Sequence, residues 1–150
     1  MIEANPETKI KSMIREGSVF YFSEETFTTD APHYFVVLNK SPLTDPSIIL
    51  VVAVTLDIKV VERIEKTNLP RETYVDINPD DCSFLKSSTL FDCNNIFTKS
   101  IDELAEKLNQ KKLKIINRIE NPIIERIKKG VLVSPLVTRE IKNLIAKSIS

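Results

Sequence analysis

The sequence predicts a single α+β domain that is mainly β, with an antiparallel sheet curled into a small barrel and helices packed outside it. Two apolar runs rich in Tyr, Phe, Val and Ile, His33–Leu38 and Ile48–Thr55, have the composition of buried strands. The loops between the early strands are too short and polar to hold crossover helices, which favours antiparallel pairing. Amphipathic helical patterns gather instead toward the C-terminus.

The first half of the chain alternates apolar strand patterns with polar loops and two short helices. An aspartate before an apolar stripe is a typical helix N-cap, and strict alternation of apolar and polar residues indicates a half-buried strand. In chain order we expect a helix over Pro6–Arg15, strands over Ser18–Phe22, His33–Leu38 and Ile48–Thr55, a helix from Asp57 through Lys66, and a strand over Glu72–Ile77.

The second half begins with strand patterns and ends with helices. Ser100 and Glu103 have the spacing of a capping box, followed by apolar residues at helical spacing. We expect strand segments over Thr89–Cys93 and Asn95–Thr98 with a bend at Cys93 and Asn94, a helix after Ser100, a strand over Leu113–Ile119, a helix opened by Asn121 and Pro122 that stops at Gly130, and a last helix opened by Ser134 and Pro135 that carries Val137, Ile141, Leu144 and Ile145.

The 150 residues form one domain, with the barrel core over about 17–100 and a helical part over about 100–150. The net charge is zero, but residues 111–150 carry ten basic and three acidic residues, a net of +7, against −7 for residues 1–110. A basic end on an acidic body can attract phosphates or an acidic partner. The alternative is that these lysines and arginines solvate the outer faces of two helices.

No apolar run approaches the roughly 20 residues that span a membrane, and the N-terminus lacks the apolar segment of a secretory signal. Two cysteines, Cys82 and Cys93, do not make a disulfide framework, although a single bridge between them stays open. We therefore expect a cytoplasmic protein with no membrane partner.

Nucleotide-binding loops are excluded, because the chain has two glycines and no phosphate-binding motif. A zinc site would need acids such as Asp80, Asp81 or Asp92 beside the single histidine and two cysteines, and those acids have the positions of turn and cap residues. We expect no cofactor and no metal.

Metal-independent RNA cleavage needs only an acid, a base and donors that stabilise the charge on the reacting phosphate. His33 can serve as acid or base, with hydroxyls from Thr55, Ser87, Ser88 and Thr89. Two alternatives stay open: His33 as an ordinary half-exposed residue at a strand end, and a hydrolase in which it activates Cys93 or Ser88.

The order of four segments, GSVFYF, PHYFVVLN, IILVVAVT and FLKSSTLFDCNNIFTKSIDEL, resembles the PemK/MazF-like toxin family. The resemblance implies an SH3-like barrel with added helices and a metal-independent endoribonuclease, usually a homodimer, that an antitoxin protein neutralises. The family commonly uses a Ser or Thr at the end of the third strand, here Thr55, and an Arg at the start of the second, where this chain has His33. The resemblance implies a catalytic role for Thr55. We expect His33 to act as the acid or base in place of the Arg, and Ser87 and Ser88 to bind RNA. A non-catalytic SH3-like protein-interaction module is the alternative.

Overall fold

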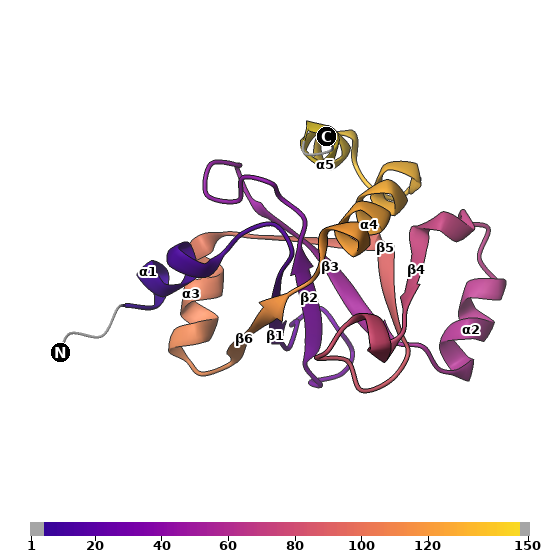
Figure 1. Ribbon diagram of the computed structural model, residues 1–150, viewed down its shortest axis with the longest axis horizontal. Coiled ribbons are helices and arrows are strands. Elements are labelled where there is room, and N and C mark those ends of the chain that lie inside the picture. Colours follow the sequence, from indigo (N-terminus) through magenta and orange to yellow (C-terminus); the bar gives the residue numbers. More distant parts are fainter. Residues whose placement is uncertain (1–4, 148–150) are drawn as a thin grey trace.

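The computed structural model describes residues 5–147 and confirms an α+β fold that is mainly β. Six strands form one antiparallel sheet in the order β4-β5-β3-β2-β1-β6 (Figure 1). Within the described residues no helix is long and apolar enough to cross a bilayer. The strands are β1 (Ser18–Phe22), β2 (His33–Val37), β3 (Ile48–Thr55), β4 (Tyr74–Ile77), β5 (Thr89–Lys99) and β6 (Leu113–Arg118).

The sheet is open, with β4 at one edge and β6 at the other. Neighbouring strands pair antiparallel throughout, as the short polar loops predict. A closed barrel would require the two edge strands to meet, but β6 pairs with β1 alone. The predicted closure into a barrel is therefore not confirmed.

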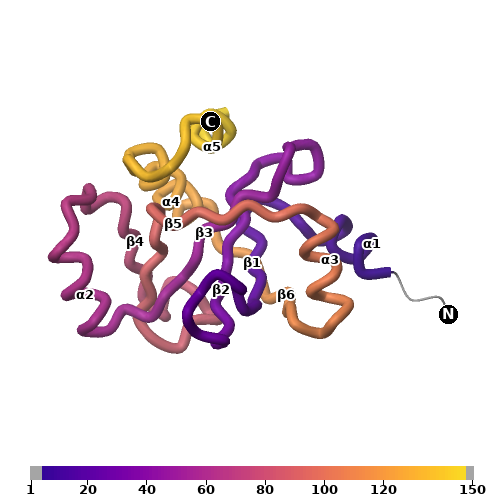
Figure 2. Tube along the Cα trace, turned by 180° about the vertical axis from the view of Figure 1, so that it is seen from behind, coloured from indigo at the N-terminus to yellow at the C-terminus, as the bar shows by residue number. Residues whose placement is uncertain are grey.

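Helices cover both faces of the sheet, which explains why its central strands are apolar throughout rather than alternating. On one face Val36, Val51 and Phe91 pack under α4 (Asn121–Val133) and α5 (Arg139–Lys147). On the other face Phe35 and Leu50 pack under α1 (Pro6–Met13) and α3 (Ile101–Asn109). Figure 2 shows α1 and α3 side by side at the opposite end of the molecule from α2 (Ile58–Glu65).

The predicted starts of α2 and α3 and the predicted bend in β5 are confirmed. The Asp57 side chain accepts a hydrogen bond from the Val60 N–H, and Ser100 with Glu103 forms a complete capping box. In β5 the register slips between residues 92 and 96, so that residues 93–95 form a bulge opposite β3. Two short 3-10 turns flank β4, η1 (Arg71–Thr73) and η2 (Pro79–Asp81).

Two predictions about the C-terminal helices are wrong. Helix α4 has Glu120 as its N-cap and continues past Gly130 to Val133. Gly130 serves close packing instead of ending the helix, because a Cβ there would lie 2.7 Å from the Cys93 Sγ atom and 2.7 Å from the Glu72 carbonyl oxygen. Helix α5 begins at Arg139, several residues after Ser134 and Pro135, and the Ile141 N–H donates to the Thr138 hydroxyl.

Candidate functional site

A cavity of about 240 Å³ lies where β3 ends, and it contains the predicted residues Thr55 and Ser87. We call it the hydroxyl cavity because five hydroxyl-bearing residues line it together with one lysine. Its lining consists of Tyr21, Tyr34, Ala53, Val54, Thr55, Leu85, Lys86, Ser87 and Thr89.

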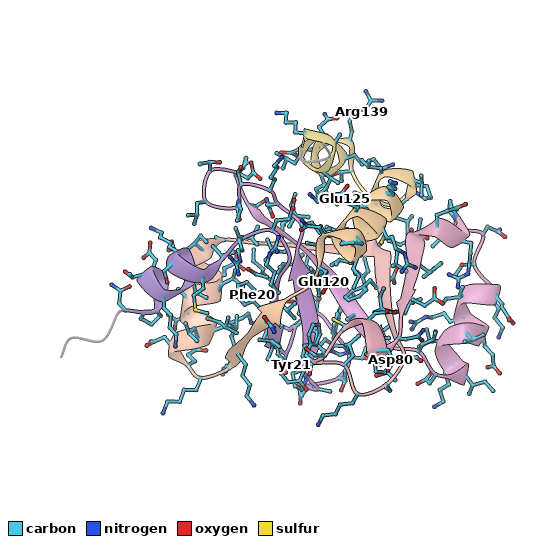
Figure 3. All side chains as sticks on the ribbon, viewed as in Figure 1. Phe20, Tyr21, Asp80, Glu120, Glu125 and Arg139 are labelled. Atoms are coloured by element: carbon cyan, nitrogen blue, oxygen red, sulfur yellow. The ribbon has the colours of Figure 1, made fainter. Side chains whose placement is uncertain are left out.

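The register of the sheet brings two tyrosines to this cavity. Tyr21 on β1 lies opposite Tyr34 on β2, and Tyr34 lies opposite Ala53 on β3. Because side chains alternate between faces, Thr55 shares the face of Ala53 and therefore of both tyrosines. The Tyr21 and Tyr34 ring centroids are 4.6 Å apart, and the Phe84 ring centroid lies 4.9 Å from that of Tyr34. Figure 3 labels Tyr21, which lies at the end of the sheet near the loop of Asp80.

Backbone contacts hold the segment before β5 against the cavity. Thr89 lies opposite Thr55, and its hydroxyl donates to the Ser87 carbonyl at 3.0 Å. The Leu56 N–H donates to the Ser88 carbonyl at 3.0 Å. Ser87 thereby lines the cavity, whereas the side chain of Ser88 is exposed and does not line it.

His33, the other predicted catalytic residue, lies at the same end of the sheet but on the opposite face. It precedes Tyr34 on β2, so its side chain projects with that of Phe35. Its ring meets the edge of Phe27 at 5.0 Å. The structure therefore places His33 and Thr55 on different sides of the sheet and does not bring their side chains together.

The His33 ring carries a polar atom without a partner. Its Nδ1 atom is buried and, within the described residues, makes no hydrogen bond. An aromatic cluster of Phe27, Phe35 and Phe97 surrounds this region, with ring centroids 5.4 to 6.3 Å apart. An unpartnered polar atom in such surroundings costs stability rather than adding to it.

The hydroxyl cavity has the donor set of an anion site. The hydroxyls of Tyr21, Tyr34, Thr55 and Ser87 and the exposed ammonium of Lys86 can donate hydrogen bonds, and no carboxylate lines the cavity. The Thr89 hydroxyl is already used, because it donates to the Ser87 carbonyl. These groups suit a phosphate oxygen, with the tyrosine rings offering flat apolar surface beside it. The lining residues include no histidine, aspartate or glutamate, so the cavity holds donors without a usual general base.

Sequence reasoning missed Tyr21, Tyr34 and Lys86. Lys86 is adjacent to Ser87, and that proximity was a usable signal. The two tyrosines gave no such signal in the sequence, because each lies within an apolar strand. They come together only through the register of β1 with β2.

The cysteines are both free and buried, and neither is suited to act as a nucleophile. Burial raises the pKa of the Cys93 thiol well above its ordinary value, and that thiol donates to the Ile127 carbonyl on the sheet face opposite His33. Burial also raises the pKa of Cys82 to about 11. A thiolate activated by His33 finds no support in this arrangement.

Within the described residues, no three His, Cys, Asp or Glu side chains cluster as a metal site would require. Comparison of the chain with protein-family models gives no match, and comparison with curated proteins gives none either.

Proposed function

We propose that the protein is a metal-independent endoribonuclease of the PemK/MazF type, acting in the cytoplasm, with RNA bound at the hydroxyl cavity. The observation that carries the proposal is the convergence of Thr55 and Ser87 with Tyr21, Tyr34 and Lys86 at the end of β3. We further propose that the open sheet is a variant of the SH3-like barrel, because its neighbouring strands pair antiparallel, as strands in such a barrel do.

The reaction is an internal transfer at phosphorus. The RNA 2′-oxygen attacks the adjacent phosphorus while its proton passes to a base. The bond from phosphorus to the 5′-oxygen breaks, and that oxygen takes a proton from an acid. The products are a 2′,3′-cyclic phosphate and a 5′-hydroxyl end. Thr55 and Ser87 donate to the non-bridging oxygens, and Lys86 balances the charge that grows on them.

The cavity contains candidates for the acid but not for the base. The phenols of Tyr21 and Tyr34 can protonate the leaving oxygen, whereas none of the lining residues is a histidine or a carboxylate. We assign the acid/base role to His33, the only histidine, and this requires the RNA to pass round the end of the sheet that His33 and Thr55 share.

The test is incubation of the purified protein with mixed RNA in EDTA. We expect cleavage, and we expect His33→Ala and Tyr34→Phe each to lower the rate by about 100-fold, the usual range for a lost acid or base. A lower cleavage rate with Tyr34→Phe but not with His33→Ala would assign the acid/base role to a residue of the cavity instead of His33. If the wild-type protein leaves all RNA intact, the proposal is wrong.

A second function is favoured by one observation. The separation of His33 from Thr55 leaves the cavity without a base, which suits a non-catalytic SH3-like module that binds a protein partner. Both functions allow a homodimer and an antitoxin-like protein partner. A small acidic reading frame beside the gene favours the toxin, and intact RNA in the EDTA assay favours the module.

A further inference from the structure

A second and larger cavity, of about 460 Å³, lies between the β1–β2 loop and the turn that joins α3 to β6. We call it the lysine groove. Its apolar surface comes from Tyr21, Phe27 and Pro32, and Lys111, Lys112 and Lys114 line its other side. Aromatic rings beside lysines are the combination that binds single-stranded nucleic acid, through base stacking and phosphate contacts.

The net charge of the groove is positive, because two of its three acidic residues are neutralised in ion pairs. Glu24 forms an ion pair with Lys99 at 2.7 Å, and Glu25 forms one with Lys107. Lys107 also lines the groove, and across the described chain no ion pair involves the other three lysines there, Lys111, Lys112 and Lys114. Asp30 is the one remaining acid among the lining residues, so the positive charge exceeds the negative charge.

The backbone fixes two of these lysines at the turn. Lys111 has a φ of +59°, the left-handed conformation that ends a helix, and its N–H donates to the Leu108 carbonyl. The Lys112 N–H donates to the Lys107 carbonyl at 2.8 Å. Both ammonium groups are exposed on an ordered turn, which limits the entropy lost when they bind a phosphate.

Tyr21 lines the lysine groove as well as the hydroxyl cavity. Lys114 lies directly opposite Tyr21 in the pairing of β6 with β1, so a lysine of the groove lies next to a residue of the hydroxyl cavity. We propose that the lysine groove binds the single-stranded RNA that flanks the nucleotide held in the hydroxyl cavity. This inference rests on the proposed function and adds a second binding region, with Phe27 as a stacking surface.

The test is binding of a short fluorescent 2′-O-methyl RNA, which has no free 2′-hydroxyl and stays intact. Affinity is measured against salt concentration for the wild type and for Lys111→Gln with Lys112→Gln. The control carries Lys59→Gln on the far helix α2 and Lys66→Gln at its C-cap. Each phosphate contact to a single strand adds about 0.7 to the salt slope, so we expect the groove variant to lose up to about 1.4. We also expect it to bind about tenfold more weakly, with the control unchanged.

Equal binding by the groove variant and the control would overturn the inference, as would a wild type that binds no RNA. A wild type that cuts RNA with no effect of the lysines contradicts this inference alone. A lysine effect on binding without any cleavage in EDTA contradicts the proposed catalysis and leaves the groove as an RNA site.

Discussion

Glu24 and Lys99 form an ion pair that is almost entirely out of solvent, with 2% and 10% of their side-chain surface exposed. Burial alone would raise the pKa of Glu24, but hydrogen bonds from Lys99 and Thr26 and the charge of Lys99 together outweigh it and lower that pKa. A lowered carboxyl pKa stabilises the folded state above the unfolded pKa, near 4.3, and that stability is lost as the pH falls through the folded value.

We therefore expect Glu24→Gln to destabilise the protein at neutral pH by about 3 kcal/mol, because it leaves Lys99 buried without its partner. Between about pH 5 and pH 3 the wild type should lose stability more steeply than the variant. Urea unfolding across this range measures both effects. Glu62→Gln on α2, where the glutamate is exposed, is the control and should follow the wild type. A Glu24→Gln variant with the wild-type slope would contradict this account of the pair.

For the candidate site, the sequence predicted which residues take part better than it predicted where their side chains lie. Thr55 and Ser87 were predicted from the sequence, and they share one cavity. The side on which His33 projects could not be predicted, because the ten residues between β2 and β3 allow either register, and a shift by one residue reverses the face. The observed pairing of Tyr34 with Ala53 determines the face on which His33 projects.

At the scale of elements, Gly130 shows how tightly α4 approaches β5 and η1. An added Cβ would lie 2.7 Å from the Cys93 Sγ atom and 2.7 Å from the Glu72 carbonyl oxygen. The backbone of η1 cannot yield as a flexible side chain could. We expect Gly130→Ala to lower the free energy of unfolding by about 1–3 kcal/mol, although alanine is the better helix former. Urea unfolding measures this change.

Lys129→Ala is the matched control, because Lys129 is the preceding residue of the same helix and is exposed. Its unfolding midpoint should stay near that of the wild type. If Gly130→Ala instead stabilises the protein by about 1 kcal/mol, as helix propensity alone predicts, the packing of α4 against β5 is looser than described.

Helix boundaries that depend on residues close in sequence could be predicted. Boundaries that depend on packing against distant segments could not. The capping box at Ser100 and the cap at Asp57 depend on neighbours in sequence, and both are confirmed. Gly130 was mistaken for a helix stop, because the same residue type serves a left-handed cap and a close backbone approach. Only the partner that α4 packs against distinguishes the two uses.

At the scale of the molecule, strand patterns predicted an antiparallel sheet but could not specify which strands form its edges or whether it closes into a barrel. Whether a sheet closes depends on which strands form its edges, and that depends on contacts far apart in sequence. Here β6 returns after α3 to pair with β1, and β4 stays at the far edge (Figure 1). The pairing of β6 with β1 also places Lys114 of the lysine groove opposite Tyr21, which lines both the groove and the hydroxyl cavity.

The central claim, that RNA reacts at the hydroxyl cavity, is tested most directly by the cleavage rate of two threonine variants under single-turnover conditions. Thr55 lines the cavity at the end of β3, whereas Thr98 is exposed on β5 opposite Ile49, at the other end of β3. We expect Thr55→Ala to cut RNA at least about 100-fold more slowly than the wild type, as when a donor to the reacting phosphate is lost. Thr98→Ala should cut at the wild-type rate. Equal rates for the two variants would contradict the claim.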